Sequence, residues 1–164
     1  RNNMKQLAGS KHCFVCGTEN EVGLKLRLMG EGDGKVFAKV IIPRQYAGWP
    51  GIVHGGILAA ILDEAAGRTV DNDPIPKHLY VTGSLNLRYR HPVHCDTPLI
   101  VEAQFVRRNG RVVTSKGWIM DENRQILTEA DAVYIEVDAD FGRENSSLED
   151  EWVIFQDEEG SNDQ

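Results

Sequence analysis

The sequence of 164 residues has no long apolar run and no excess of basic residues. Its longest apolar segment, residues 57–62, is far shorter than the roughly 20 residues that cross a bilayer, so no membrane span is expected. Lys and Arg total 18 against 25 Asp and Glu, for a formal net charge of -7. This balance argues against general nucleic-acid binding, whose affinity comes mainly from cations that neutralise phosphates.

Other signals are missing as well. The first residues lack the charged start and apolar middle of a signal peptide, and the 3 cysteines are an odd number. Reduced thiols in a reducing compartment are the simplest interpretation, so we expect a cytoplasmic protein. The chain also has no glycine-rich phosphate loop of the Walker or dinucleotide type, which argues against nucleotide hydrolysis and nicotinamide chemistry.

A chain of this length fits one domain, because two separate cores would each be marginal. We expect this domain at residues 23–141, between an N-terminal extension (1–22) and an acidic tail (142–164) in which only residues 152–155 are apolar enough to dock. Alternating apolar residues predict a hairpin over residues 24–42 and a run rich in Ala, Leu and Ile predicts a helix from Gly51 to about Val70. Four further strands are predicted at residues 79–90, 98–108, 111–120 and 125–137.

The predicted helix has almost no polar side chains in its first three turns, which is typical of a helix enclosed on most sides. Two strands, one helix and four more strands with short connections indicate an α+β protein with mainly antiparallel pairing. A curved antiparallel sheet of five to six strands wrapped around one long central helix meets both conditions. This arrangement is the hotdog fold.

Two features of the helix point to chemistry. A helix that begins at Gly55 or Gly56 presents unpaired N–H groups that can stabilise an oxyanion, although these glycines can also serve only a tight turn. Asp63 lies at an otherwise apolar level of the helix, where a carboxylate is expected to be paired or to react. The neighbouring Glu64 has Arg68 four residues later as an ion-pair partner, so Asp63 is the better candidate for base or nucleophile.

His54 precedes Asp63 by nine residues, or about 13 Å along a helix, so the two side chains cannot cooperate within one chain. We expect His54 to orient the turn. A Cys13-x-x-Cys16 turn offers an alternative zinc site, with further ligands among His12, His91, His94 and Cys95. One compact Cys pair with scattered histidines is weak support for zinc, and no metal is expected.

Two motifs resemble a known family. The stretch from Tyr46 to Gly56, which includes Val53-His54-Gly55-Gly56, is followed by Asp63 nine residues after the histidine, and a second stretch runs from Thr82 to Pro92. Together these motifs resemble the PaaI-like and human THEM-type hotdog thioesterases of the 4HBT superfamily, over roughly residues 13–137.

The resemblance implies hydrolysis of the thioester between an acyl group and coenzyme A. It implies that the Gly55 N–H is the oxyanion donor, Asp63 the catalytic acid, Thr82 the hydroxyl that positions water or the carboxylate, and His54 the family's histidine. It also implies a homodimer or a dimer of dimers with sites at the interface, which agrees with the distance of about 12 Å between Gly55 and Asp63 along one helix.

Coenzyme A carries phosphates, and the best cationic candidates to hold them are Arg88, Arg90 and His91, although these residues can equally be solvated at a strand end. Coenzyme A is part of the substrate, so no cofactor is expected. Two other functions remain open: an acyl-CoA-binding hotdog protein without turnover, and a hotdog enoyl-CoA hydratase or dehydratase that uses His54 and Asp63 across an interface.

Overall fold

One long helix and one large sheet are the main elements of the fold. The computed structural model describes residues 4–71, 73–138, 140–141 and 148–154. The helices are α1 (Gly55–Gly67), a short 3-10 helix (Arg44–Tyr46) and α2 (Leu148–Glu151). The strands are β1 (Lys5–Gln6), β2 (Gly9–Ser10), β3 (Met29–Gly32), β4 (Lys35–Ile41), β5 (Leu79–Tyr89), β6 (Pro98–Asn109), β7 (Val112–Met120), β8 (Ile126–Val137) and β9 (Trp152–Val153).

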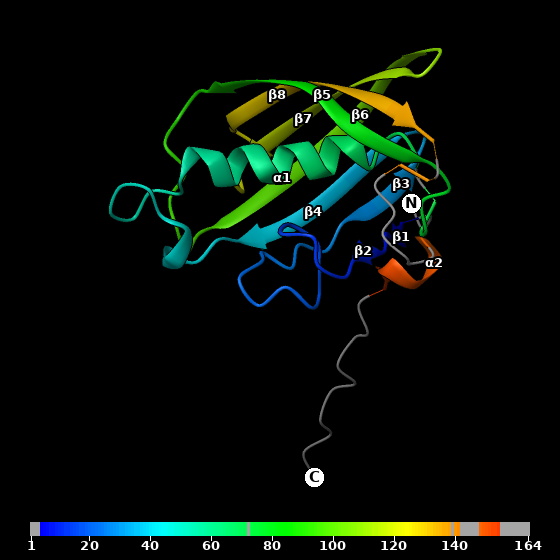
Figure 1. Ribbon diagram of the computed structural model, residues 1–164. Helices are drawn as coiled ribbons and strands as arrows, with labels where there is room; N and C mark the ends of the chain where they lie inside the picture. The colour runs from blue at the N-terminus through cyan, green and yellow to red at the C-terminus, as the bar shows by residue number, and fades with distance from the viewer. Residues whose placement is uncertain (1–3, 72, 139, 142–147, 155–164) are drawn as a thin grey trace.

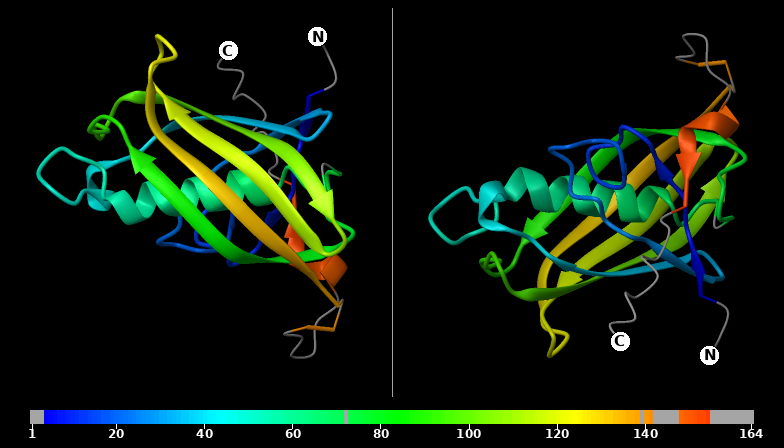
Figure 2. Two further views of the ribbon diagram at one scale, coloured as in Figure 1. Left: turned by 90° about the horizontal axis from the view of Figure 1, so that it is seen from above. Right: turned by 90° about the horizontal axis from the view of Figure 1, so that it is seen from below.

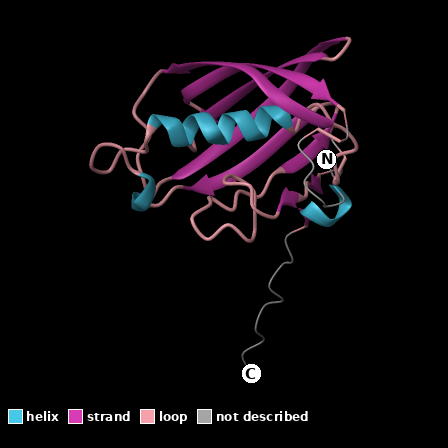
Figure 3. Cartoon of the chain, viewed as in Figure 1, coloured by secondary structure: helices cyan, strands magenta, loops and turns pink. Residues whose placement is uncertain are grey.

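Seven strands form one antiparallel sheet in the order β1-β3-β4-β6-β7-β8-β5. The sheet curves around α1, which packs against β6, β7 and β8 (Figures 1 and 3). The predicted α+β hotdog arrangement is confirmed. The sheet has one strand more than the expected five to six, because the two-residue strand β1 pairs with β3.

Helix α1 is shorter than the predicted span of residues 51–70. It begins at Gly55 because Gly51 lies in a turn with a φ of 76°, which favours glycine. Its sheet-facing side is made of apolar residues that are fully or almost fully buried: Leu58, Ile61, Leu62, Ala65 and Ala66. A side chain at Gly117 would approach Leu62 to 3.1 Å, so glycine in β7 lets the helix lie close to the sheet.

The N-terminal segment is part of the packed structure. Seen from above the sheet covers α1, and seen from below the segment before β3 crosses the helix (Figure 2). Leu7, Val15 and Leu28 are buried in the same core as α1. Residues 1–22, expected as an extension, therefore contribute through their described part to the core of the domain.

The predicted hairpin over residues 24–42 is wrong in its first half. Residues 24–28 form no strand, and Lys25 adopts a left-handed φ of 50° that interrupts an extended chain. Their backbone groups bond to other parts of the N-terminal segment: Leu24 N–H donates to the Phe14 carbonyl at 2.8 Å and Leu26 N–H to the Val15 carbonyl at 2.8 Å. The alternation of leucines reflects burial against the core without a strand partner.

The C-terminal segment returns to the domain at β9, which pairs with β2. Trp152 and Val153 lie in the apolar patch predicted to dock, whereas Phe155 and most of the acidic tail lie outside the described residues. Within the described ranges no helix combines the length and apolar character needed to cross a membrane.

Candidate active site

The start of α1 is organised by His54. His54 is the N-cap, and its Nδ1 accepts a hydrogen bond from the Gly56 N–H at 2.9 Å. The Gly56 N–H is therefore occupied within the chain. Among the described residues nothing accepts from the Gly55 N–H, as is usual for the first turn of a helix. Of the two glycines predicted as oxyanion donors, Gly55 is the one whose N–H is available.

A hollow of about 320 Å³ lies beside Gly55. The residues that line this hollow are Ile52, Val53, Gly55, Leu58, Tyr89, Arg90, His91, Pro92 and Val93. Among them, the Tyr89 hydroxyl donates to the Gly55 carbonyl at 2.9 Å. Two of the three cationic candidates are thus near Gly55, and Arg90 is also paired with Glu129 at 2.7 Å. The third, Arg88, is exposed on β5 and is not among the residues that line this hollow.

The other half of the candidate site surrounds Asp63, in the C-terminal half of α1. Thr82 Oγ1 donates to the half-buried Asp63 carboxylate, at 2.9 Å from Oδ1 and 3.1 Å from Oδ2. The register of β5 against β8 shifts between Thr82 and Ser84, and Thr82 lies at this irregularity. The structure therefore brings together Asp63 and Thr82, as predicted.

Tyr134 is a third member of this group that the sequence analysis missed. Its hydroxyl donates to the Asp63 carbonyl oxygen at 2.6 Å and lies 3.1 Å from Asp63 Oδ1. Burial, followed by the nearby Asp63 carboxylate, raises the pKa of Tyr134, so the hydroxyl stays protonated and remains a donor. The only available signal was the alternation of β8, which places Tyr134 on the buried face.

A pocket of about 160 Å³ opens at Asp63. It is lined by Asp63, Glu64, Gly67, Arg68, Asp71, Pro76, His78, Leu79, Tyr80, Thr82, Tyr134 and Trp152. None of these residues lines the hollow beside Gly55. Within one chain, the oxyanion donor and the carboxylate thus face two different depressions. His54 caps the same end of α1 as Gly55, nine residues or about 13 Å along the helix from Asp63.

The predicted ion pair between Glu64 and Arg68 is wrong. Glu64 instead accepts hydrogen bonds from the Cys13 and Cys16 thiols, at 3.6 and 3.2 Å. Hydrogen bonding with Cys13, together with burial and the Glu64 carboxylate, raises the pKa of the Cys16 thiol, which therefore stays a donor. Arg68 donates to the Ala8 carbonyl at 2.5 Å and lies over the Trp152 ring. The N-terminal segment supplies partners that helix spacing alone does not reveal.

The ligand set of the alternative zinc site is not assembled. The backbone of His94 forms a β-bridge with Ile52, and the Cys95 N–H donates to the Gly51 carbonyl, so both residues lie near the start of α1. The Cys13 and Cys16 thiols instead contact the C-terminal half of the helix. Over the described part of the chain, the one group of potential metal ligands is Cys13, Cys16 and Glu64.

Comparison with known proteins finds one similar family. Residues 50–128 match the family model of the thioesterase superfamily. Over this part the chain is similar to the thioesterase superfamily. The matched residues include Gly55, Asp63 and Thr82, whereas Cys13, Cys16 and Tyr134 lie outside them.

Two curated relatives carry the same name. The acyl-coenzyme A thioesterase THEM4 of Rattus norvegicus is 32% identical over 94 residues, which are 57% of this chain and 39% of the relative. The protein of that name from Mus musculus is 30% identical over 92 residues, 56% of this chain and 38% of the relative. The matched part of this chain thus spans less than half the length of these relatives.

Solved structures share the architecture. A crystal structure of a thioesterase superfamily protein is 30% identical, with a TM-score of 0.69 over 76% of this chain and 60% of that chain. The Escherichia coli PaaI protein is 13% identical, with a TM-score of 0.63 over 70% of this chain and 81% of its own. A Streptococcus mutans protein solved with acetyl CoA bound is 15% identical, with a TM-score of 0.62 over 73% of this chain and 94% of its own. At these two lower identities the likeness concerns the fold alone.

Proposed function

We propose that this protein is an acyl-CoA thioesterase, with Asp63 as its catalytic carboxylate. The observation that carries this proposal is the half-buried Asp63 carboxylate, oriented by the Thr82 and Tyr134 hydroxyls and open to a pocket. A carboxylate held in this way by donors on neighbouring strands is suited to act as a base or a nucleophile. The name of the two curated relatives, acyl-coenzyme A thioesterase, supports the same substrate class.

The reaction needs a water molecule and the thioester. Asp63 either removes a proton from water that attacks the carbonyl carbon, or attacks this carbon itself and is released by water. Negative charge develops on the carbonyl oxygen, where the Gly55 N–H and the positive end of α1 stabilise it. In the first route the C–S bond breaks after water has attacked, and the coenzyme A thiolate takes up the proton that Asp63 removed from water. In the second route the C–S bond breaks first and leaves an anhydride between the acyl group and Asp63; water hydrolyses this anhydride and supplies the proton for the thiolate. Both routes yield the coenzyme A thiol and the carboxylic acid. No cofactor takes part in these steps.

We further propose that two chains build each site. Gly55 and Asp63 are about 12 Å apart along α1 and face separate hollows, but both must reach one thioester group. A two-fold axis beside two antiparallel copies of α1 would bring the Gly55 end of one copy to the Asp63 end of the other. Strand β5 lies at the edge of the sheet with Thr82, Gly83 and Ser84 exposed, which leaves room for such a partner.

The coenzyme A moiety is proposed to lie near the Gly55 hollow. Arg90 and His91 line this hollow and are the nearest predicted cationic residues to the oxyanion donor. Their side chains can contact phosphate oxygens that extend away from the thioester. Arg88, exposed on β5 beside them, can add to the local positive charge but does not line the hollow.

The test is to incubate the purified protein with acyl-CoA substrates of several chain lengths and to follow thiol release. A substrate-free sample corrects for the 3 cysteines of the protein itself. We expect release from at least one substrate and almost none with Asp63→Asn. Binding that raises the melting temperature without cleavage would favour the non-catalytic acyl-CoA-binding protein. Loss of enoyl-CoA absorbance without thiol release would favour the hydratase.

A further inference from the structure

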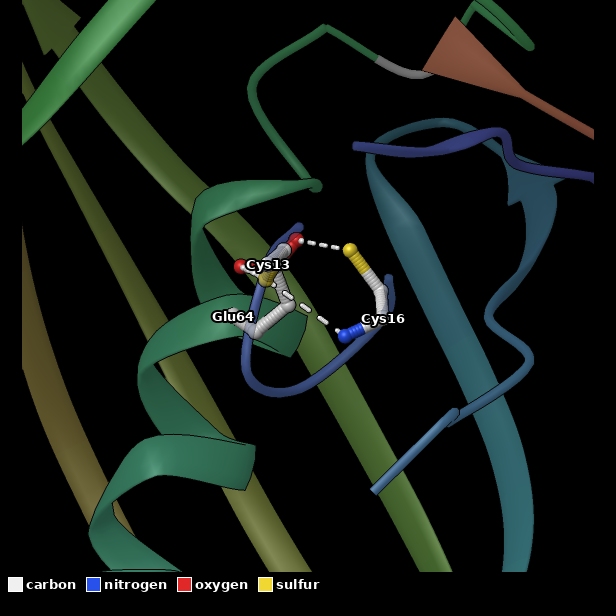
Figure 4. A group of neighbouring side chains, drawn as sticks. All are labelled: Cys13, Cys16 and Glu64. Carbon is white, nitrogen blue, oxygen red and sulfur yellow. Dashed lines mark hydrogen bonds between the residues drawn. The ribbon is translucent and has the colours of Figure 1, made fainter. Parts of the chain in front are cut away.

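The Cys13–Gly17 turn brings two thiols against a carboxylate of α1. Cys13 Sγ lies 3.6 Å from Glu64 Oε2, and Cys16 Sγ lies 3.2 Å from Glu64 Oε1 (Figure 4). The three potential ligand atoms all lie within 4.8 Å of one another. Cys16 is buried, Cys13 and Glu64 are half-buried, and both cysteines are free thiols. Cys13 and Cys16 line neither of the two hollows assigned to catalysis, whereas Glu64 also lines the pocket at Asp63.

The turn is shaped to present both sulfur atoms on the same side. The backbone N–H groups of Val15 and Cys16 point at Cys13 Sγ, at 3.3 and 3.4 Å. Such N–H donors stabilise negative charge on sulfur. The turn is closed by Gly17, whose N–H donates to the Cys13 carbonyl at 2.9 Å. A side chain at Gly17 would come within 2.5 Å of that carbonyl oxygen, so this tight turn requires glycine.

We propose that Cys13, Cys16 and Glu64 bind one zinc ion, with water as its fourth ligand. In a tetrahedron, zinc–sulfur bonds of about 2.3 Å and a zinc–oxygen bond of about 2.1 Å separate sulfur from oxygen by about 3.6 Å and sulfur from sulfur by about 3.8 Å. The observed sulfur–oxygen contacts of 3.2 and 3.6 Å, and the 4.8 Å within which all three ligand atoms lie, need only small displacements to admit the ion. Thiolate ligands favour zinc over magnesium or calcium, which prefer oxygen.

The surroundings also suit the charge of this complex. Zinc binding would displace the protons of both thiols into solvent. The two thiolates and one carboxylate then carry three negative charges against the two positive charges of zinc. Arg68, only 7% exposed, lies one helical turn after Glu64, and the carboxylate and both thiols act on it electrostatically. Its guanidinium offsets the remaining negative charge, so that a buried net charge is avoided.

The bound ion would connect the N-terminal segment to α1 directly beside Asp63. Without it, the described contacts between this turn and Glu64 are thiol–carboxylate hydrogen bonds. The proposed ion would hold the N-terminal segment on α1, and this proposal does not rest on the proposed thioesterase activity. It departs from the sequence-based expectation of no metal, because the third ligand comes from a helix 48 residues after Cys16 in the chain.

The test is to titrate the metal-free 164-residue chain with Co²⁺ under reducing conditions, after all 3 thiols have been counted as reduced. We expect one equivalent of Co²⁺ to give thiolate-to-cobalt absorption bands, and one equivalent of Zn²⁺ to abolish them. Loss of a residue that only orients a metal ligand lowers metal affinity by roughly 10- to 100-fold. Cys13→Ser and Cys16→Ser should each lower zinc affinity by more than this, because each removes a ligand. Cys95→Ser, which removes a buried cysteine outside the cluster, is the matched control.

Glu64→Gln keeps the shape of the side chain, and it tests the third ligand if the cysteine variants fold poorly. We expect weaker zinc binding and a smaller rise in melting temperature on zinc addition than in the unsubstituted protein. Absence of the absorption bands in the reduced protein would overturn the proposal. So would equal zinc affinity in the Glu64→Gln or Cys16→Ser variant, or loss of binding in Cys95→Ser.

Discussion

At the residue scale, the adjacent carboxylates Asp63 and Glu64 have different surroundings. Successive helix residues point about 100° apart, so these two side chains leave α1 in different directions. Asp63 faces the hydroxyls of Thr82 and Tyr134, whereas Glu64 faces the thiols of the N-terminal turn. The two acids are therefore proposed to serve different purposes, one chemical and one structural.

Replacement of Asp63 by Asn tests the chemical role. We expect kcat to fall by at least about two orders of magnitude, because carboxylates acting as base or nucleophile contribute that much. Glu64→Gln should reduce kcat by less than about tenfold. Asp131→Asn, on an exposed position of β8 beside Lys116, is the matched control for loss of an acid. Steady-state kinetics would contradict the assignment if Asp63→Asn and Glu64→Gln lost activity equally.

The Thr82 hydroxyl is expected to orient the Asp63 carboxylate. Thr82→Val keeps the size and branching but removes the donor, and kcat should fall by roughly one order of magnitude, since a hydrogen bond to a charged group is worth that much. Thr82→Ser should retain most of the activity, and Ser84→Ala on the same strand is the control. If kcat fell as much in Thr82→Ser as in Thr82→Val, packing of the strand rather than the hydroxyl would explain the loss of activity.

At the scale of elements, the start of α1 depends on His54. The side chain caps the helix through the Gly56 N–H, and the His54 N–H donates to the Tyr46 carbonyl at 2.9 Å. By using up the Gly56 N–H, this cap leaves Gly55 as the donor at the helix start. The same contacts give His54 a structural function that needs no proton transfer.

Two substitutions separate capping from base catalysis. His54→Ala should lower the free energy of unfolding by about 0.5–2 kcal/mol, the usual effect of losing an N-cap, whereas His54→Asn should restore most of it because Asn is a good N-cap. We expect activity to follow stability, so that His54→Asn stays active. Denaturant unfolding and kcat are measured on the same samples. An inactive but fully stable His54→Asn protein would show that the imidazole itself takes part in the reaction.

At the scale of the whole molecule, the length of α1 separates the two halves of the candidate site. Gly55 opens onto one hollow and Asp63 onto another. The sheet covers one side of the helix and the N-terminal segment crosses the other (Figure 2). The two groups cannot approach each other inside one chain, and a second copy is the simplest source of the missing half.

Mixing two inactive variants tests the two-chain site. Gly55→Pro removes the proposed N–H donor. The backbone accommodates proline here, because Gly55 is the first helical residue and His54 before it is extended, with a ψ of 133°. After subunit exchange with Asp63→Asn, half of the dimers are mixed, and each has one intact site of two. We therefore expect roughly a quarter of the unsubstituted activity to return.

The control mixture combines Asp63→Asn with a chain that carries both substitutions. No site in that mixture retains Asp63, so it must stay inactive. Native mass spectrometry confirms that mixed dimers have formed. Inactivity of the first mixture, despite mixed dimers, would mean that Asp63 works with another group of its own chain.

Local patterns in the sequence determined most of the fold. Runs of strand character separated by turn signals located β5 to β8, with bounds within a residue or two of those observed, because turn residues interrupt the extended chain between the strands. The continuous apolar run identified α1, and the His-Gly-Gly turn marked its start. Asp63 was found because a carboxylate is out of place at an apolar level of a helix. The pairing of Asp63 with Thr82 came from resemblance to a family, not from spacing.

The tertiary structure alone decided the contacts that join distant segments. Tyr134 reaches Asp63 across 71 positions of the chain, and Cys13 reaches Glu64 across 51. Neither contact has a local signature, since each depends on how the sheet curves and on where the N-terminal segment crosses the helix. For the same reason the leucines of residues 24–28 alternate as in a strand, and Leu26 and Leu28 are buried, although these residues form no strand. Periodicity shows which side chains are buried, whereas the path of the chain determines which partners they meet.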